Sequence, residues 1–350
     1  MQKRLSEGIA IMGITAKELA KELMLSEAAV SMALNNKSGV STKTRQRVLE
    51  AARNRGYDFS KITQEKIPSG TVYFIIFIKH GAVVSETPFF SQLTEGVEKE
   101  CRNAGYKFSI CHLYDDSDLE KEMGSILYSD CIGIILLGTE MTKEDFHIFE
   151  HIRVPVVLLD TYHDSPKMDC VLINNVEGAF KATSHLIKKC KKQPGYLHSS
   201  YSIFNFEERA DGFYKAVRKN GMSTSNSITH LLSPSVEGAY ADMKDLLSRQ
   251  EPIAECYFAD NDAIAVGAIK AFKEFGYRIP FDISIVGFDN MPFSAYIDPG
   301  LTTIHVPKQY MGSTAAKRLI TVLSENEFYP VKIEIETSLL QRGSVTRERS

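Results

Sequence analysis

Two carboxylates follow short apolar runs in the second half of the sequence and are candidates for ligand chemistry. Asp262 comes just after the run ECYFAD and opens an amphipathic stretch, and Asp289 ends the run ISIVGFD. In an open α/β sheet, ligands bind beyond the carboxyl ends of the strands, where helix N-termini also point. Both carboxylates are therefore expected where a small ligand would bind.

An aromatic pair and an arginine extend this candidate site. Phe89-Phe90 ends the first connection between an apolar run and a helix, and it can lay an aromatic face on a sugar or a base. Arg209, in the helical stretch ERADGFYKAV, offers a planar fork for paired hydroxyls or a carboxylate. Either phenylalanine can instead belong to the core, and Arg209 and Asp262 can be capping or ion-pairing groups. For Asp289 a structural turn acid is the favoured interpretation.

No sequence motif places a catalytic group or a metal ion. The chain lacks G-x-x-x-x-G-K-[ST], G-x-G-x-x-G after a strand, G-x-S-x-G and H-E-x-x-H, and core or surface placement is the favoured interpretation for its nine histidines. The six cysteines are scattered without C-x-x-C, which argues against a zinc site or a disulfide framework and fits free thiols in a reducing cytosol. We expect no catalytic residues, no metal and no cofactor.

The elements that position these residues change in kind along the chain. From residue 72 onward, short β-rich runs alternate with amphipathic helical stretches; the runs are 72–78, 107–113, 131–138, 155–160, 170–174, 195–200, 255–260, 283–289 and 301–306. Near-continuous apolar strands predict parallel sheets that are covered on both faces. Their number favours two doubly wound sheets side by side, with a cleft between them.

The first 57 residues predict three short helices instead. Residues 15–18, TAKE, have the spelling of a capping box, Met24-Leu25 forms a turn, and Ser26 can cap a second helix. A third helix starts near Ser41 and stops at Gly56. The exposed face of the second helix carries few bulky groups: Glu27, Ala28, Ser31 and Met32. Such a face can approach base edges in a DNA major groove, although an ordinary helical hairpin is the alternative.

The charge distribution favours the DNA interpretation. The chain nets -3, yet its first 66 residues hold 12 Lys and Arg against 7 Asp and Glu, whereas the remainder holds 29 against 37. This asymmetry suggests that one end alone faces a polyanion. The N-terminus has no sustained apolar h-region, and no apolar run is long enough to span a membrane, so a cytoplasmic protein is expected.

Several motifs together resemble one family. ITAKELAKEL, LSEAAVSMALN and VSTKTRQRV match its N-terminal pattern, and FFSQLTEGVEKECRNAGY, ERADGF, ADNDAIAVGAI, ISIVGFDN, DPGLTTIHVPKQYMG and LLQRGS match later landmarks. On these motifs the chain resembles, over nearly its full length, the LacI/GalR family of transcriptional regulators, which includes the lactose and purine repressors. The segment KKCKKQ at 188–193 departs from the family's usual Gly-His turn, and it is most simply a solvated helix end.

The resemblance implies a fold and a division of the chain. The fold class is a small all-α helix-turn-helix DNA-binding domain plus an α/β periplasmic-binding-protein-like effector domain of two doubly wound parallel-sheet subdomains. The boundaries expected are 1–57 for the DNA-binding domain, 58–70 for a hinge, 71–342 for the effector-binding and dimerisation domain, and 343–350 for a tail. Within the effector domain, the N-subdomain takes about 71–172 and 291–322, and the C-subdomain about 173–290 and 323–342.

The resemblance also assigns roles to individual residues. Glu27 and Ala28 fall where the family reads bases, and Met32 stands where an Arg is usual, so the operator should differ from the family's common sequence. Residues that set the register on DNA would be Thr15, Ser26, Ser31, Asn35, Thr42 and Arg45. The hinge stretch 63–68, TQEKIP, lacks the family's wedge Leu, so a minor-groove wedge and a simple tether both stay open. Phe90, Arg209, Asp262 and Thr161 match effector-contacting positions of the family.

The function expected is sequence-specific DNA binding, as a repressor, with operator affinity controlled by a small molecule in the cleft. The partners expected are double-stranded operator DNA, a small-molecule effector and a second copy of the chain in a homodimer, with no membrane. A sugar or sugar phosphate is favoured as effector and a nucleobase is the alternative. Whether the effector is an inducer or a corepressor stays open. A solute-binding protein without DNA function and an enzyme on the same sheets are the competing classes.

Overall fold

The computed structural model describes residues 14–35, 39–57, 70–84, 88–149, 151–163, 168–325 and 329–345, apart from the side chain of Thr42. The hinge stretch 63–68 lies outside these residues. The chain divides into two compact units, an N-terminal unit of residues 1–68 and a main unit of residues 69–350.

The N-terminal unit contains three helices, α1 (Ala16–Leu23), α2 (Glu27–Leu34) and α3 (Thr42–Asn54). Each begins where a side chain accepts a backbone N–H: Thr15 in a reciprocal capping box with Glu18, Ser26 from Ala29, and Ser41 from Thr44. The helices enclose one small core, whose buried members are Leu19, Ala20, Leu23, Val30, Ala33, Leu34, Val48 and Ala52. The predicted three-helix unit is confirmed.

The main unit contains two six-stranded sheets. The first has the order β11-β5-β4-β3-β1-β2, with β1 (Thr71–Ile78), β2 (Lys107–Tyr114), β3 (Cys131–Leu137), β4 (Val156–Leu159), β5 (Asp169–Ile173) and β11 (Lys332–Ile335). The second has the order β12-β10-β9-β8-β6-β7, with β6 (Gly195–Ser199), β7 (Thr229–Leu232), β8 (Cys256–Ala259), β9 (Ser284–Asp289), β10 (Thr302–His305) and β12 (Ser338–Leu340). Pairing is parallel except between β10 and β12, so the predicted fold class is confirmed.

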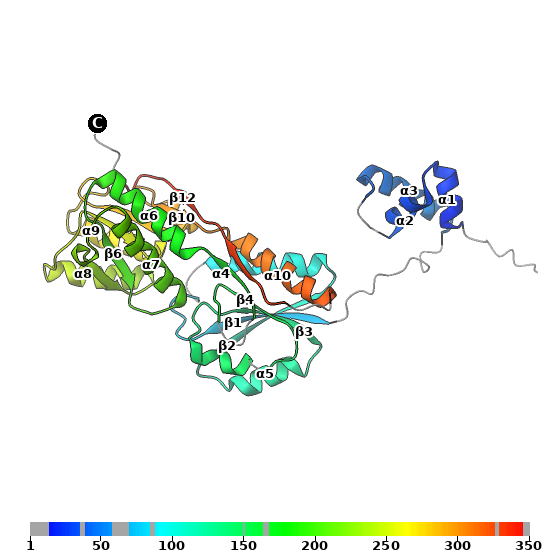
Figure 1. Cartoon of the computed structure of the whole chain (residues 1–350), viewed down its shortest axis with the longest axis horizontal. Helices are drawn as coiled ribbons and strands as arrows, with labels where there is room; N and C mark the ends of the chain where they lie inside the picture. Colours follow the sequence, from blue (N-terminus) through cyan, green and yellow to red (C-terminus); the bar gives the residue numbers. More distant parts are fainter. Residues whose placement is uncertain are drawn as a thin grey trace, which may run out of the picture. The chain divides into compact units, whose positions relative to one another are not determined.

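Helices cover both faces of each sheet (Figure 1). On the first sheet, α4 (Phe89–Asn103) and α10 (Lys308–Ser324) pack together on one face, and α5 (Leu119–Leu127) lies on the other. On the second sheet, α6 (Asn175–Cys190) packs with α7 (Phe204–Lys219), and α8 (Val236–Ser248) packs with α9 (Asp262–Glu274). Short 3-10 turns span Lys143–Phe149, Thr224–Asn226 and Pro292–Ala295.

The strands read as continuous apolar runs because successive side chains enter different cores. Along β6, Tyr196 enters the core under α6 and α7, and the next residue, Leu197, enters the core under α8 and α9. Phe258 and Tyr257 of β8 alternate in the same way. Both faces of these strands are therefore buried, as parallel sheets with helices on each side require.

The chain crosses between the two sheets at places that differ from the expected subdomain boundaries. Segment 291–322 was expected in the N-subdomain, but β10 at 302–305 pairs with β9 in the second sheet. Segment 323–342 was expected in the C-subdomain, but β11 at 332–335 pairs with β5 in the first sheet. After β5 the chain passes from the first sheet to the second. It returns to the first sheet between β10 and α10, and it passes to the second again between β11 and β12. Strand pairing between residues far apart in sequence decides these boundaries.

The C-terminal boundary also needs correction, because the expected tail at 343–350 begins with packed residues. Ser344 is fully buried; its hydroxyl donates to the carbonyl of Ile285 at 2.6 Å and accepts from the backbone N–H of Thr302 at 2.8 Å. The second sheet therefore holds the chain at least as far as Val345, which is also buried.

Candidate functional site

A cavity lies between the two sheets of the main unit, beyond the carboxyl ends of their strands. It contains about 340 Å³ of empty space, part of which is open solvent. The first sheet and its connections supply Val83, Phe89, Phe90, Thr139 and Asp160, and the second supplies Ile203, Asn205, Phe206, Arg209, Asn261 and Asp289. The mixture of aromatic and polar groups in its wall is typical of ligand sites in proteins.

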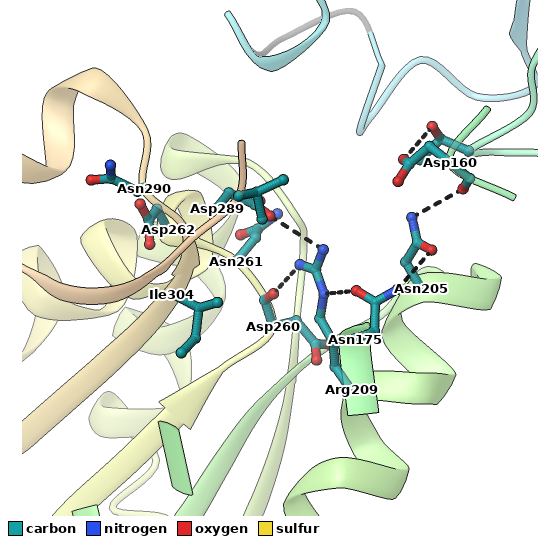
Figure 2. A network of polar contacts seen from close by, with 12 residues as sticks. Asp160, Asn175, Asn205, Arg209, Asp260, Asn261, Asp262, Asp289, Asn290 and Ile304 are labelled. Atoms are coloured by element: carbon teal, nitrogen blue, oxygen red, sulfur yellow. Dashed lines mark hydrogen bonds and ion pairs between the residues drawn. The ribbon is translucent and has the colours of Figure 1, made fainter. Parts of the chain in front are cut away.

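Arg209 is the central group of a polar network (Figure 2). Its Nε donates to Oδ1 of Asn175 at 2.9 Å, one terminal nitrogen donates to the carbonyl of Asp260, and the other lies 3.2 Å from Oδ1 of Asp289. The guanidinium also lies 3.8 Å above the centre of the Phe288 ring. These contacts fix the planar group in one orientation, so its remaining surface can meet a ligand without further ordering.

The network continues across the cleft through two asparagines. Asn175, the first residue of α6, donates to Oδ1 of Asn205 at 3.1 Å. Asn205 in α7 then donates to the backbone carbonyl of Asp160, which follows β4 of the first sheet, at 3.3 Å. Side chains from α6 and α7 thereby link the second sheet to the first across the cavity.

Asp160 is buried at the cavity wall, and burial raises the pKa of its carboxyl to about 6. A hydrogen bond of 2.7 Å from the Thr139 hydroxyl and the charge of Arg209 lower the pKa, and neither offsets the burial. Asp160 has a φ of 61° and Asp289 a φ of 102°, a region that side chains other than glycine rarely adopt. Such conformations concentrate at ligand sites, where the surrounding structure holds the strain.

Asp289 shows both of the roles that its sequence position suggested. It ends β9 in a tight turn, where its backbone carbonyl accepts from Lys308, and its side chain lines the cavity. Its Oδ1 is buried close to Arg209 but accepts no aligned hydrogen bond within the described chain. A buried carboxylate oxygen in that state is suited to accept from a ligand hydroxyl or amine.

The aromatic pair belongs to the core and to the cavity wall at once. Phe89 and Phe90 begin α4, their ring centres are 5.0 Å apart, and both are mostly buried. Both line the cavity, and Phe206 lines it from α7. A place in the core and a contact with the ligand therefore do not exclude each other. One face of a ring can pack in the core while its edge faces the cavity.

Two expected ligand contacts are not at the cavity wall, and this corrects the sequence-based assignment. Asp262 is fully buried and accepts from the backbone N–H of Met291 at 2.7 Å and from the hydroxyls of Ser294 and Thr303 at 2.5 Å each. Thr161 is buried against Gly138. Asn261, the N-cap of α9, lines the cavity, whereas the next residue turns back into the protein.

Some cavity residues that were not expected from the sequence can still be recognised by their positions in it. Thr139 follows the predicted run 131–138, and Asp160 ends the predicted run 155–160, so the rule that selected Asp289 also selects them. Asn205 lies one helical turn before Arg209 on α7, and therefore on the same face. Val83 and Ile203 lie in connections whose path only the tertiary structure defines.

A buried glutamate shapes one wall of the cavity. Glu140 accepts from the backbone N–H groups of five residues at 2.9 to 3.1 Å, namely Lys79, His80, Gly81, Val83 and Val84. Burial acts to raise the pKa of this carboxyl, and the backbone hydrogen bonds outweigh it and hold the pKa below its usual value. The loop from β1 towards α4 therefore folds around one ionised side chain.

In the N-terminal unit, α2 buries one face and exposes the other. Glu27, Ala28 and Ser31 are exposed, and Met32 is half-buried with its Sδ close to Gly39. Glu27 lies 4.0 Å from Lys17 of α1, and both side chains are about two-thirds exposed or more, at 67% and 70%. An exposed pair of this kind contributes little, so Glu27 remains able to change partner.

The residues expected to set the register on DNA lie around the same unit. Thr15 and Ser26 are exposed N-caps, and Asn35 donates to the backbone carbonyl of Ser31 at 2.8 Å. Arg45 is half-buried on α3. The side chain of Thr42 lies outside the described residues.

The described part of the chain shows neither a metal cluster nor a membrane-spanning helix. No cluster of three or more His, Cys, Asp or Glu side chains there could hold a metal ion. No helix there is both long enough and apolar enough to cross a membrane.

Comparisons with known families and proteins agree with this geometry. A model described as "Bacterial regulatory proteins, lacI family" matches residues 15–59, and one described as "Periplasmic binding protein-like domain" matches residues 183–345. A protein described as "HTH-type transcriptional repressor PurR" from Mannheimia succiniciproducens is 29% identical over 95% of this chain and 99% of its own length. One from Actinobacillus pleuropneumoniae with the same description is 28% identical, over 95% and 98%.

Solved structures share the fold. A CelR–cellobiose complex, described as a transcriptional regulator, has a TM-score of 0.71 and 22% identity, covering 95% of this chain and 99% of that one. The lac repressor dimer bound to operator and an anti-inducer has a TM-score of 0.69 and 21% identity, with the same coverage. A LacI family regulator from Enterococcus faecium with bound ribose has a TM-score of 0.69 and 24% identity, covering 79% and 100%.

The resemblance drawn from the sequence motifs is confirmed. The N-terminal helical unit and the two-sheet unit each match the corresponding family model, and relatives align over nearly the whole chain. The chain belongs to the LacI family of bacterial regulatory proteins, whose members are DNA-binding transcriptional regulators and not enzymes.

Proposed function

We propose that this regulator acts as a repressor, and that a small molecule bound in the cavity of the main unit changes its affinity for operator DNA. The network that runs from Arg209 through Asn175 and Asn205 to the main chain of Asp160 carries the proposal. A ligand that contacts this network touches both sheets, so its binding energy depends on how the sheets are placed. Such a ligand shifts the protein towards the arrangement of the two sheets that it binds more tightly.

In this proposal the exposed face of α2 reads bases in the major groove. Glu27 can accept from the exocyclic amine of a cytosine, whereas Ala28 offers only a methyl group and Met32 cannot pair with guanine. Thr15, Ser26, Ser31, Asn35, Thr42 and Arg45 contact phosphates or hold register. The proposal places the protein in the cytoplasm, where its DNA lies.

We further propose that the protein works as a homodimer. Two N-terminal units on one duplex require half-sites with centres about 34 to 36 Å apart, or a multiple of that spacing. A ligand-dependent change in the main units of a symmetric dimer would alter the spacing of the two readers, and a small misfit would lower affinity.

The charges around the cavity favour a neutral sugar as effector over a sugar phosphate. Two carboxylates, Asp160 and Asp289, and one guanidinium, Arg209, line it. A phosphate that met the remaining N–H groups of Arg209 would also face the two acidic groups, whose negative charges oppose its own. Hydroxyl groups can donate to the carboxylates, and the edges of Phe89 and Phe90 can meet the apolar face of a pyranose.

A nucleobase is the second candidate. Relatives named PurR align with 95% of this chain, and a flat base could also pack against Phe89, Phe90 or Phe206. The two candidates differ in what they need from the carboxylates, since a base presents fewer donors to Asp160 and Asp289 than a sugar does.

DNA binding is tested by fluorescence anisotropy with fragments from upstream of the protein's own gene. We expect tight binding of one fragment and a steep loss of affinity as salt rises, because contacts to phosphates release counterions. Glu27→Ala should lose discrimination of about 1 to 3 kcal/mol at one base pair, whereas Glu50→Ala, an exposed residue of α3, should not. Negligible binding at every salt concentration would reject the regulator.

The effector is tested by a thermal-shift screen of neutral sugars, sugar phosphates and purines, because a ligand that binds only the folded state raises its Tm. We expect a neutral sugar to raise the Tm and to change operator affinity in the anisotropy assay. A shift with purines alone would replace the sugar by the nucleobase and leave the DNA-binding function intact. A ligand that raises the Tm without changing operator affinity would contradict the coupling.

A further inference from the structure

The lysine-rich segment 188–193 lies beside a second basic segment, residues 215–219 at the end of α7. Helices α6 and α7 pack along each other. Beyond them, the side-chain amide of Gln193, in the turn after α6, donates to the backbone carbonyl of Ser223 at 3.0 Å and to the hydroxyl of Ser227 at 2.7 Å, both of which follow α7. Two basic segments that are separate in the sequence therefore meet where these two helices end.

We call the seven basic side chains of these two segments the α6–α7 patch. Neither segment contains an acidic residue, although Asp and Glu outnumber Lys and Arg by 37 to 29 after residue 66. All seven side chains are exposed apart from Lys189, which is half-buried. The members of the patch are Lys188, Lys189, Lys191, Lys192, Lys215, Arg218 and Lys219.

The positive charges of the patch are almost uncompensated within the chain. Lys192 forms an ion pair of 2.8 Å with Glu255, and the other six members form no ion pair with any residue that the structure describes. Many basic side chains elsewhere in the main unit do have an acidic partner, for example Arg102 with Glu98, Lys107 with Asp130, Arg249 with Asp245 and Arg278 with Asp282. Burial lowers the pKa of His185 on α6, and the charges of Lys189 and Lys188 lower it further.

Stabilisation of the helix ends explains only part of this cluster. Basic groups interact favourably with the carbonyls of the last turn of a helix, and the effect falls off beyond that turn. Lys215 lies a full turn before the end of α7, with its Nζ 5.5 Å from the centre of the Phe180 ring, and Lys191 and Lys192 lie beyond the end of α6. Like charges placed side by side destabilise a folded chain, so a cluster of this size is suited to an anionic partner that relieves the repulsion.

The patch is separate from the effector cavity. Helix α6 begins at Asn175, which contacts Arg209 at the cavity wall, and it ends 16 residues later at Cys190. With a rise of 1.5 Å per residue, the two ends of this helix are roughly 22 Å apart. A partner at the patch can therefore bind without entering the cavity.

The chemistry of the patch favours an extended polyanion over a small anion or an unpaired strand. Small anions bind at helix N-termini, which offer N–H groups, whereas the patch surrounds two helix C-termini, which offer carbonyls. Six of the seven members are lysines, whose point charges meet phosphates without requiring a fixed geometry. The two segments contain no aromatic residue on which an unpaired base could stack.

We propose that the α6–α7 patch binds the phosphate backbone of duplex DNA without regard to sequence, as a second DNA contact located on the main unit. Duplex DNA carries one negative charge per about 1.7 Å of its axis, so several lysines can each meet a phosphate and release counterions. The patch carries more net positive charge than the first 66 residues, which hold 12 basic and 7 acidic residues. With one contact in each unit, a single chain can hold two stretches of duplex.

The test uses the full-length protein and a random-sequence DNA duplex. Lysines are acetylated briefly with and without the duplex, and the extent of acetylation at each lysine is measured by peptide mass spectrometry. At about 50 mM salt we expect the duplex to slow acetylation of the patch lysines by roughly threefold or more, and at about 200 mM salt most of this protection should be lost. Lys99 and Lys121, exposed lysines of α4 and α5, should stay unprotected.

Two triple variants sharpen the test. The patch variant neutralises three lysines around the end of α6: Lys188→Gln, Lys189→Gln and Lys191→Gln. The matched control neutralises three exposed lysines on the first-sheet side: Lys99→Gln, Lys121→Gln and Lys143→Gln. In the patch variant, the duplex concentration that half-protects the remaining patch lysines should rise roughly tenfold or more, because phosphate contacts are lost. In the control variant it should not change, and the Tm of each variant checks that it is folded.

The proposal is overturned if the duplex leaves the patch lysines as reactive as before, or if it protects Lys99 and Lys121 equally. Protection by polyglutamate at a lower concentration of charges than by the duplex would assign the patch to an acidic protein instead. Stronger protection by single-stranded DNA would likewise reject the duplex. Lys17 and Lys21, exposed on α1, report on the proposed DNA reader separately. If they stay reactive while the patch is protected, the reader is rejected and the patch is supported.

Discussion

The carboxyl groups near the cavity differ in their surroundings, and these differences set their protonation. Burial raises the pKa of Asp160 to about 6 and that of Asp262 to about 7, and the charge of Asp289 adds to both shifts. Glu140 is as deeply buried, yet its pKa is lowered because five backbone N–H groups solvate its charge. Three buried acids therefore respond differently to pH, according to the donors around each.

Asp262→Asn tests the structural role of Asp262. A group whose folded pKa is raised stabilises the fold below its unfolded pKa of 3.8, and this stability is lost as pH rises through about 7. Asparagine keeps acceptors for Met291 and Ser294 and can donate to the Thr303 hydroxyl, so the variant should fold. We expect the stability lost between pH 5 and pH 8 to be smaller in the variant, by roughly 2–4 kcal/mol.

The measurement is the Tm of both proteins across that pH range, with Asp116→Asn, an exposed acid, as control. Because Asp262 does not line the cavity, the variant should also keep the Tm shift caused by the effector. Parallel pH profiles for the variant and the unaltered protein would contradict the raised pKa. Complete loss of the effector shift in a folded variant would restore Asp262 as a ligand contact.

The connection from β1 to α4 illustrates how one side chain can organise a segment without regular structure. Glu140 binds five of its backbone N–H groups, and Lys79 anchors its start through 2.9 Å contacts to both carboxylate oxygens of Asp145. The segment carries Val83 to the cavity wall. The cavity therefore depends on an element that no hydrophobic period in the sequence could reveal.

Glu140→Gln should weaken this connection, because the amide replaces one accepting oxygen with a donor that faces other donors. Leaving buried N–H groups without acceptors costs about 1–3 kcal/mol each. We expect a loss of roughly 2–5 kcal/mol in urea unfolding and faster hydrogen exchange in residues 79–84. Glu144→Gln, an exposed neighbour, is the control. Unchanged exchange in 79–84 would show that the carboxylate does not hold the segment.

Across the main unit, aromatic contacts join the two sides of the cleft. His80, from the β1–α4 connection, stacks on Tyr201, which follows β6, with ring centres 4.5 Å apart. Tyr162, which follows β4, meets Phe204 of α7 edge-on at 5.2 Å. With the hydrogen bond from Asn205 to the main chain of Asp160, these contacts favour an arrangement in which the two sides are close.

Tyr201→Ala should destabilise that close arrangement. An aromatic pair contributes about 0.5–1.5 kcal/mol beyond its buried area, so we expect effector affinity to fall by roughly threefold to tenfold. Calorimetry measures the affinity. The fall should lie mainly in a faster dissociation rate, measured by stopped-flow, because opening of the cleft releases the ligand. Tyr128→Ala is the control, since Tyr128 is 95% exposed on the first-sheet side. Equal affinities for both variants would show that the stacked pair does not hold the cleft closed.

The local elements of this protein can be predicted from its sequence. Thr15, Ser26 and Ser41 begin helices because their side-chain oxygens accept nearby backbone N–H groups, and such contacts are local in sequence. Continuous apolar runs were enough to predict buried parallel strands. The edge strand β7 was missed because only two of its four side chains, His230 and Leu232, are buried, so its sequence carries little apolar signal.

Long-range packing sets which residues share the cavity and where the chain changes sheet. Asn261 lines the cavity and Asp262 does not, because one residue caps α9 and the next turns inward by a third of a helical turn. β11 and β12 are adjacent in sequence but pair in different sheets, with β5 and β10. The lining of the cavity and the pairing of these strands depend on contacts between residues far apart in the chain. A local sequence pattern contains no information about the free energies of such contacts.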